Sequence, residues 1–415
     1  MTPAPPLTGP PIGARLAHFK EEWFRFTDDP FVRSIVAEGV KIELEEEPCQ
    51  ERLPARVYSP EDDDVIAEEI KTLLEKNIVV EHLDPQQAAP LPRTFVLSYF
   101  TVPKKDGGKR SILDLREFNL KVRKRYFRLE SIKTARELLR SGDYMVKIDI
   151  KDAYFHLPIH QAFRAFFRFN FRGKTYEFTC LPMGLTSSPR LFTRFMKPVI
   201  AHLRNMGHRL VIYLDDILLI ASSEEEIATA RDATLELLRQ LGWTVNEKKS
   251  VLTPSQEIEF LGLNIDTRTM MISLPDKKRH DLAAAINDLL QRNATRTLTI
   301  REAARMLGKM SATAMAVEPA RQPLLDQVRA ALMRGQSWES SILLPDLVVE
   351  ACRWWIHSLH AWNSRSIIPR PIEAAVVSDA SPAALGATVS ISKQKFRFQR
   401  HLSPEESAWT CKTYR

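Results

Sequence analysis

The sequence predicts an α+β fold from the order of its segments along the chain. Strand-like apolar runs and turns dominate from Phe95 to Ile265, and the pattern becomes helical after Pro275. Four predicted helices interrupt the strand-rich part, near 131–140, 151–163, 187–206 and 224–241. Because the strands and the helices are largely segregated, we expect an antiparallel sheet with helices packed on it, followed by a helical part.

Two helices are expected before residue 95. The segment "LAHFKEEWFRFTDDPFVRSIV", after about 15 residues that look disordered, reads as one helix with an aromatic stripe at Phe19, Trp23 and Phe26. The segment "SPEDDDVIAEEIKTLLEKNIVVE" reads as a helix with Ser59 as N-cap and Pro60 in its first position. The acids that follow complement the helix dipole, which explains them without a metal site.

The composition is that of a soluble globular protein long enough for two to four domains, with 415 residues, 44% apolar and 27% charged. From residue 103 to 136 twelve Lys and Arg face four Asp and Glu, a local +8, so the remaining residues carry −1 of the total +7. This basic stretch indicates a polyanionic partner, or else a solvated basic surface. Four scattered cysteines argue against a zinc site or a disulfide framework, and no run is long enough for a membrane span. We therefore expect an intracellular protein, cytoplasmic or nuclear, with no membrane partner.

The stretch "RLVIYLDDILLIAS" places Asp215 and Asp216 between two short apolar runs. The simplest shape is a β-hairpin with the two acids at its tip. Acids are common in turns, so an ordinary turn is the alternative. Leu214 before the pair and the lack of a glycine after it make that alternative less favourable.

A second apolar strand ends in acids, in "YMVKIDIKDAYFHLPI". Asp149 falls at the end of the strand, whereas Asp152 falls where a turn or helix begins and reads as a cap. If this strand is a neighbour of the hairpin, Asp149 faces Asp215 and Asp216. Three carboxylates this close need cations between them, and two Mg²⁺ ions about 4 Å apart are the usual clamp for phosphoryl transfer.

A basic hairpin is predicted in "FTVPKKDGGKRSIL", where Asp106-Gly107-Gly108 forms the turn. Its tip carries Lys104, Lys105, Lys109 and Arg110, which could close over a triphosphate. An exposed basic hairpin without a ligand is the alternative.

Two further patterns lie in the C-terminal part. "LTIREAARMLGKMSATAMA" opens with a capping box of Thr299 and Glu302, and Arg305 and Lys309 share one face, either for a phosphate backbone or for solvent. From Ala374 the pattern reads strand, turn, strand, with Asp379 near the end of the first strand and a helix starting at Ser403.

The order of "KKDGGKRSILDLREFN", "KIDIKDAYFHLPI", "TCLPMGLTSSP", "YLDD", "GWTVNEKKS" and "EFLGL" resembles the successive motifs of reverse transcriptases. The phrases "DIKDAYFHLPI" and "ARMLGKMSATAMAV" are most similar to the tyrosine-recombinase (DIRS-type) retrotransposons. The resemblance implies a right-hand polymerase with fingers, palm and thumb, an antiparallel palm sheet and a helical thumb and connection. The implied boundaries are an N-terminal extension (1–50, partly disordered), fingers and palm (51–270), thumb and connection (271–370), and the incomplete start of a ribonuclease H-like domain (371–415).

The resemblance also implies the roles of individual residues. It makes Asp149, Asp215 and Asp216 the catalytic acids, and it adds the Ile150 carbonyl as a metal ligand and Lys249 as general acid to the leaving pyrophosphate; a solvated Lys249 is the alternative. The implied nucleotide-binding residues are Lys104, Lys109, Arg110, Asp152, Ala153, Tyr154 as the steric gate against ribonucleotides, Met183 and Gly184. The implied primer grip is Phe260, Leu261 and Gly262, and Asp379 is the first metal-binding acid of the ribonuclease H segment.

The function implied is an RNA-directed DNA polymerase of a retroelement, which extends a primer 3′-hydroxyl with dNTPs by two-metal catalysis with Mg²⁺ or Mn²⁺. The expected partners are an RNA or DNA template and a DNA or RNA primer. Two alternatives stay open: ribonuclease H as the principal activity, and a non-catalytic nucleic-acid-binding remnant of such an element.

Overall fold

The structure is a computed structural model in which the chain divides into two compact units, Met1–Arg365 and Ser366–Arg415. No helix among the described residues is both long enough and apolar enough to span a bilayer. The residues that the structure describes are 9–48, 50, 57–82, 95–103, 107–317, 326, 328–331, 334–368, 374–381, 383–391 and 394–403.

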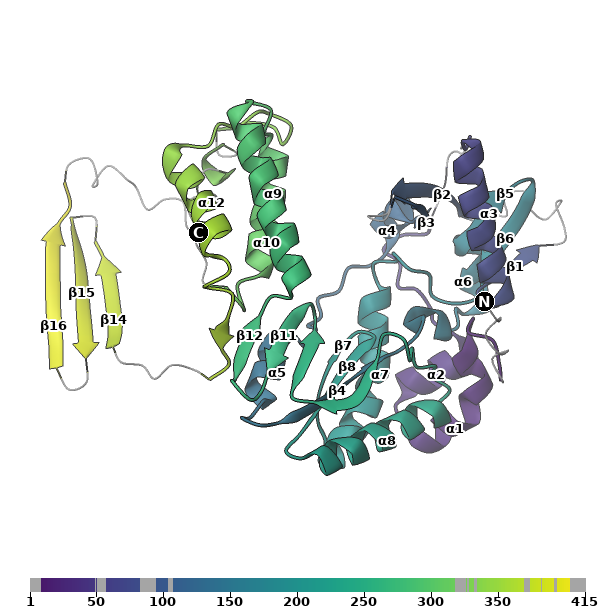
Figure 1. Ribbon diagram of the computed structural model, residues 1–415. Coiled ribbons are helices and arrows are strands. Elements are labelled where there is room, and N and C mark those ends of the chain that lie inside the picture. The colour runs from purple at the N-terminus through teal and green to yellow at the C-terminus, as the bar shows by residue number, and fades with distance from the viewer. Residues whose placement is uncertain are drawn as a thin grey trace. The chain divides into compact units, whose positions relative to one another are not determined.

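A four-stranded antiparallel sheet in the order β7-β8-β4-β9, which we call the palm sheet, lies at the centre of the first unit (Figure 1). Its inward residues are fully buried, as at Val146, Ile148 and Leu219, because the apolar runs of both central strands face packed helices. Helix α8 packs against β8 and β4, and α5 and α7 contact β7. The strands and helices are β4 (Tyr144–Asp149), β7 (Arg209–Tyr213), β8 (Asp216–Ala221), β9 (Val251–Ser255), α5 (Ile132–Leu138), α7 (Ser188–Asn205) and α8 (Glu224–Gln240).

A five-stranded sheet in the order β1-β6-β5-β2-β3, the finger sheet, is covered by α3 (Figure 1). All its pairs are antiparallel except β2 with β5. Ser59 caps α3 and Pro60 begins it, as predicted. The helix ends at Glu75, however, and the "VVEH" that follows forms β1, because Asn77 turns the chain with a positive φ of 54°. The elements are α3 (Pro60–Glu75), β1 (Val79–His82), β2 (Val96–Pro103), β3 (Lys109–Asp114), α4 (Arg116–Lys121), β5 (Arg168–Phe171) and β6 (Lys174–Phe178).

The single helix predicted across Phe19, Trp23 and Phe26 is wrong. The chain forms η1 (Arg15–Phe19), α1 (Lys20–Phe26) and α2 (Pro30–Glu38), and the Asp29 side chain caps α2. These elements are part of the main core rather than a peripheral extension. Trp23 is fully buried, and its Nε1 donates a hydrogen bond to the Leu241 carbonyl oxygen at 2.9 Å.

The helix predicted at 151–163 is also wrong. Only η2 (Ala153–His156), α6 (Gln161–Arg164) and η3 (Ala165–Phe167) form there. Asp152 is the N-cap residue of η2, as predicted, but it has a left-handed φ of 51° and its side chain makes no capping hydrogen bond. The carboxylate instead pairs with Lys76 Nζ at 2.8 Å, which ties this turn to the end of α3.

A second sheet, in the order β10-β11-β12-β13, follows the palm sheet and leads into the helical part. The predicted capping box at Thr299 and Glu302 is confirmed at the start of α10. Arg305 and Lys309 are both exposed on that helix. The elements are β10 (Glu257–Phe260), β11 (Leu263–Asp266), β12 (Met271–Ser273), α9 (Asp276–Ala294), α10 (Ile300–Ala312), α12 (Asp346–Ser358) and β13 (Arg365–Ser366).

The second unit contains a three-stranded antiparallel sheet, β14-β15-β16. This confirms the predicted strand, turn and strand after Ala374, whereas the helix predicted from Ser403 lies outside the described residues. Asp379 is exposed on β14 and pairs in register with Gly386. The strands are β14 (Ala374–Ala380), β15 (Ala384–Ile391) and β16 (Gln394–His401).

Candidate active site

The predicted hairpin with acids at its tip is formed by β7 and β8. Tyr213 pairs with Asp216, so Leu214 and Asp215 make a two-residue turn. Leu214 has a positive φ of 54°, a conformation that costs a non-glycine residue roughly 1–2 kcal/mol. Such strain is concentrated at functional sites, where the surrounding structure holds it in place.

Strand β4 is the neighbour of this hairpin, which was the condition for Asp149 to face its acids. Asp149 stands directly opposite Asp216 in the antiparallel register, so the two side chains lie on one face of the sheet. The backbone N–H of Ile150 donates to the Asp215 carbonyl oxygen at 2.8 Å, which fixes the hairpin tip against the end of β4. The Asp149 N–H in turn donates to the Ser250 hydroxyl at 3.0 Å. Two segments more than 60 residues apart are thereby joined at their acidic ends.

The environment disfavours charge on the acids of the hairpin. Burial raises the pKa of Asp215, and the negative charge of Asp149 raises it further. Burial also raises the pKa of Asp216, with the charge of Asp215 adding to the effect, while Lys147 and Lys249 oppose it. Asp149 itself is 7% exposed. Lys147 and Lys249 thus do not fully offset the negative charge of the acids. A bound cation would compensate the remainder.

The donor atoms at this edge fit a hard divalent ion. They are carboxylate oxygens and the Ile150 carbonyl oxygen, which accepts no hydrogen bond found among the described residues. In that same part of the chain, no three Asp, Glu, His or Cys side chains converge closely enough to form a metal-binding group. An ion held here would accordingly take its ligands from two carboxylates, the backbone carbonyl and water or substrate.

Tyr154 lies beside the acids. Its ring packs edge-on against Phe192, with centroids 5.5 Å apart. Burial raises the pKa of Tyr154 to about 12, and the charge of Asp215 contributes to the shift. Ala153 before it is buried, so the turn after β4 holds the Tyr154 ring close enough to Asp215 to feel its charge.

The loop of Met183 and Gly184 is held by Asn119, the last residue of the chain's "REFN" motif. Asn119 Nδ2 donates to the Gly184 carbonyl oxygen at 3.0 Å, and its Oδ1 accepts from the Thr186 N–H at 2.9 Å. Gly184 has a φ of 91°, which favours glycine, and Met183 is 47% exposed. The hydrogen bonds of Asn119 fix the backbone of this loop, and the exposed Met183 side chain is open to contact with a ligand.

The basic hairpin exists, with Arg110 opposite Val102 in the β2–β3 register. Arg110 is exposed, whereas Lys104 and Lys105 lie outside the described residues. Lys109 does not project freely from the tip. Its Nζ pairs with Glu61 at 2.8 Å and Asp62 at 2.9 Å, both on α3. Hydrogen bonds from Thr101 and Lys109 lower the pKa of Asp62 to about 2.

Part of the basic stretch from 103 to 136 is neutralised within the chain. Residues 43–45 run beside 121–123, with the Arg123 N–H donating to the Glu43 carbonyl oxygen at 2.8 Å. Three ion pairs flank this contact: Lys121–Glu46, Arg123–Glu45 and Arg125–Glu43. The local excess of positive charge seen in the sequence therefore overstates what is open to a polyanion.

The predicted primer-grip residues form the turn between β10 and β11. Leu261 and Gly262 both have positive φ, 50° and 71°, the pattern of a tight type I′ hairpin turn. Phe260 is fully buried, so its side chain anchors the turn in the core. Lys278 Nζ from α9 donates to the Gly262 carbonyl oxygen at 2.8 Å.

Two residues at this site were missed from the sequence. Lys147 alternates with Asp149 along β4, and its charge opposes the pKa rise of Asp216; the period of two was the signal for it. Lys278 had no sequence signal, because its partner lies in another element.

The predicted residue Lys249 is exposed, and its charge acts on both Asp215 and Asp216.

Comparison with known proteins agrees with this geometry. Residues 102–265 match the model of the family described as "Reverse transcriptase (RNA-dependent DNA polymerase)". The chain is 28% identical over 236 residues to the "Enzymatic polyprotein" of Soybean chlorotic mottle virus, covering 55% of this chain and 32% of that protein. It is 31% identical over 172 residues to the "Gag-Pro-Pol polyprotein" of Human T-cell leukemia virus 2, covering 39% of this chain and 12% of that protein. The chain thus spans a third or less of these relatives.

Solved structures show the fold. The foamy viral protease-reverse transcriptase in complex with dsDNA is similar with a TM-score of 0.62 and 19% identity, covering 95% of this chain and 82% of that one. Its complex with an RNA/DNA hybrid is similar with a TM-score of 0.59 and 20% identity, covering 95% and 53%. The α+β fold predicted from the sequence is confirmed as that of a right-hand polymerase. Residues 102–265 are thus similar to the reverse transcriptase domains of viral polyproteins.

Proposed function

We propose that this chain is the polymerase part of a retroelement reverse transcriptase, which extends a primer 3′-hydroxyl with dNTPs on an RNA or DNA template. The observation that carries the proposal is the register of β4 with β8, which sets Asp149 opposite Asp216 with Asp215 at the adjoining tip. The matched family and the nucleic-acid complexes of the structural neighbours support it.

In this proposal Asp149, Asp215 and the Ile150 carbonyl hold two divalent ions, Mg²⁺ or Mn²⁺, and Asp216 adds negative charge beside them. When bound, these ions supply stabilisation of the charge on the attacking and leaving oxygens. Partial burial of the acids lowers the effective dielectric constant around them, which strengthens their hold on a cation.

The remaining residues bind and orient the nucleotide. Arg110, with Lys104 before it, is proposed to hold the triphosphate, since an arginine offers a planar fork to phosphate oxygens. Lys109 holds the hairpin on α3 through its acid partners, so its proposed contact with phosphate requires it to exchange them. Tyr154 occupies the volume of a ribose 2′-hydroxyl, and Asp152 and Ala153 shape the turn that presents it.

The chemical step balances as a nucleotidyl transfer. The primer 3′-oxygen forms a bond to the α-phosphorus while the bond from that phosphorus to the pyrophosphate oxygen breaks. The hydroxyl proton leaves to solvent, and Lys249 is proposed to give a proton to the pyrophosphate. This role is supported by the charge of Lys249, which lowers the pKa of both Asp215 and Asp216.

Primer extension with the full chain tests the proposal, with a labelled primer on an RNA template, dNTPs and Mg²⁺. We expect Asp215→Asn to abolish extension while leaving primer–template binding in place. Equal extension by both proteins discards the enzyme claim. Binding without any extension by the unmodified protein supports the non-catalytic alternative instead.

Finer assignments also stay proposals. We propose that the element belongs to the tyrosine-recombinase (DIRS-type) group, that it acts inside the cell, and that residues 371–415 begin a ribonuclease H domain with Asp379 as its first acid. Asp379 on β14 is compatible with that role. Hydrolysis of an RNA–DNA hybrid that disappears with Asp379→Ala would support the nuclease, and its absence would dismiss it.

A further inference from the structure

Strand β4, strand β7 and the β10–β11 hairpin all start beside one set of contacts. We call this set the root cluster: Asp143, Arg209, Gln256 and Thr267. Asp143 is 1% exposed and Thr267 is fully buried. Asp143 precedes β4, Arg209 begins β7, and Gln256 and Thr267 flank the β10–β11 hairpin. The three arms that carry the catalytic acids and the primer-grip turn therefore share an origin.

On the catalytic side, the cluster is joined by a bidentate ion pair. Arg209 donates from both terminal nitrogens to the two carboxylate oxygens of Asp143, each at 2.7 Å. The Arg140 N–H donates to the same carboxylate at 2.7 Å. These bonds fix the start of β4 to the start of β7.

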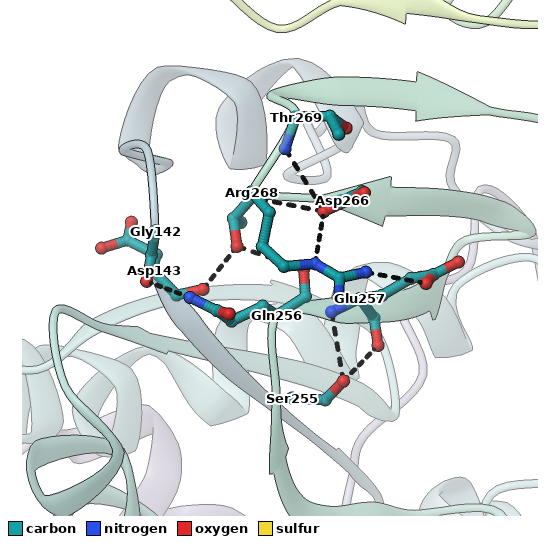
Figure 2. Close-up of polar contacts among 9 residues, drawn as sticks. Gly142, Asp143, Ser255, Gln256, Glu257, Asp266, Arg268 and Thr269 are labelled. Atoms are coloured by element: carbon teal, nitrogen blue, oxygen red, sulfur yellow. Dashed lines mark hydrogen bonds and ion pairs between the residues drawn. The ribbon is translucent and has the colours of Figure 1, made fainter.

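On the primer-grip side, the cluster is joined by hydrogen bonds, and Figure 2 shows the one between the Gly142–Asp143 turn and Gln256, which lies between β9 and β10. Gln256 Nε2 donates to the Gly142 carbonyl oxygen at 2.8 Å. The Thr267 hydroxyl donates to the Asp143 carbonyl oxygen at 2.5 Å, and the Gly142 N–H donates to the Thr267 carbonyl oxygen at 2.9 Å. Asp143 is thus held by its carboxylate on one side and by its carbonyl on the other.

The three arms have the same length. Asp149 lies six positions after Asp143, Asp215 six positions after Arg209, and Gly262 six positions after Gln256. At roughly 3.3 Å per residue each arm is about 20 Å long. A rotation of about 3° at the root then moves the far end of an arm by about 1 Å, a displacement that can cost an enzyme on the order of a hundredfold in rate.

We propose that Thr267 is a positioning residue: through Asp143 it sets the primer-grip turn in register with the catalytic acids. The inference rests on the proposed function and adds to it a determinant about 20 Å from the chemistry. Arg268, the next residue, provides a contrast. It bridges Glu257 and Asp266 on the surface with a side chain 56% exposed, and it makes no contact with Asp143 among those found (Figure 2).

The test uses the full chain with Thr267→Val, Thr267→Ser and the surface control Arg268→Gln. Valine keeps the shape and the backbone bonds of Thr267 but removes the hydroxyl bond to the Asp143 carbonyl oxygen and the longer one to the Gln256 carbonyl oxygen, while serine keeps the hydroxyl. Single-nucleotide incorporation measured by rapid quench gives the incorporation rate and the dNTP Kd, and the burst amplitude corrects for the active fraction. A loss of fold lowers the amplitude, whereas misplacement of the primer end lowers the rate per active site.

We expect Thr267→Val to lower the incorporation rate about tenfold with the dNTP Kd changed by less than about twofold. Thr267→Ser and Arg268→Gln should stay close to the unmodified protein. An unchanged rate in Thr267→Val, or an equal fall in Thr267→Ser, overturns this inference alone. If the unmodified protein incorporates nothing, the proposed function is refuted and this role with it.

Discussion

Replacing Asp216 with Asn should stabilise the metal-free protein at neutral pH. Asp149 and Asp216 are opposed in register, so their Cβ atoms lie about 5 Å apart. Two unit charges at that separation repel by roughly 3 kcal/mol at an effective dielectric constant of about 20. Screening by water at this partly exposed edge reduces the repulsion, so we expect a gain of about 1 kcal/mol in the free energy of unfolding.

The gain should depend on pH with a definite sign. The pKa of Asp216 is raised in the folded state, so the folded protein binds the proton more tightly than the unfolded chain. Above the folded pKa the destabilising charge is fully present, and it disappears as the pH falls to the unfolded value near 4. The difference between Asp216→Asn and the unmodified protein should accordingly be largest at pH 7 and vanish by about pH 4.

Thermal melting in EDTA and in Mg²⁺ measures this effect. In EDTA at pH 7 the variant should melt about 1–2 °C higher, the shift that 1 kcal/mol produces in a unit of this size. Adding Mg²⁺ should raise the melting temperature of the unmodified protein more than that of the variant, because the ion replaces repulsion with attraction. A variant that melts lower in EDTA, or a difference that grows toward pH 4, would refute the reasoning.

Two other substitutions test the nucleotide-binding residues. Tyr154→Ala should relax discrimination against ribonucleotides by opening the volume beside Asp215, and unchanged sugar selectivity in single-nucleotide incorporation would count against the gate. Arg110→Met should raise the KM for dNTP by about tenfold, the worth of one lost charge-assisted contact, in steady-state extension assays. Lys109→Met should raise it less, because the Lys109 ammonium is held by acids of α3; a larger effect of Lys109→Met would show that it leaves those partners to bind phosphate.

Features set by local spacing could be predicted from the sequence. The hairpin of β7 and β8 follows from two apolar runs separated by two residues, and the β2–β3 hairpin from two runs around a glycine pair. The caps at Ser59 and Thr299 follow from residue type and spacing alone. Each of these signals lies within a few residues of the structure that it specifies.

Contacts across the chain could not be predicted in this way. The partners of Lys109 lie 47 and 48 residues away on α3, and the partner of Asp152 lies 76 residues away. The pairing of Asp149 with Asp216 was a hypothesis about neighbouring strands that only the register decides. Side-chain periods identify which face a residue occupies but not which element covers that face.

The broken N-terminal helix is a different case, because the signal was present. Asp29 followed by Pro30 is an N-cap with a proline at the first helical position, which predicts a new helix there. The aromatic period through Phe26 suggested continuity and obscured that signal. A local cap is stronger evidence for a helix end than a side-chain period that crosses it.

The burial of Trp23 bears on how this chain can be divided for expression. Its ring packs on Phe195 and Trp243, with centroids 4.7 and 6.5 Å apart. A fragment trimmed to the matched span 102–265 would remove that tryptophan and expose two aromatic rings to water. The smallest soluble piece worth producing therefore starts ahead of η1, some ninety residues upstream of where the family match begins.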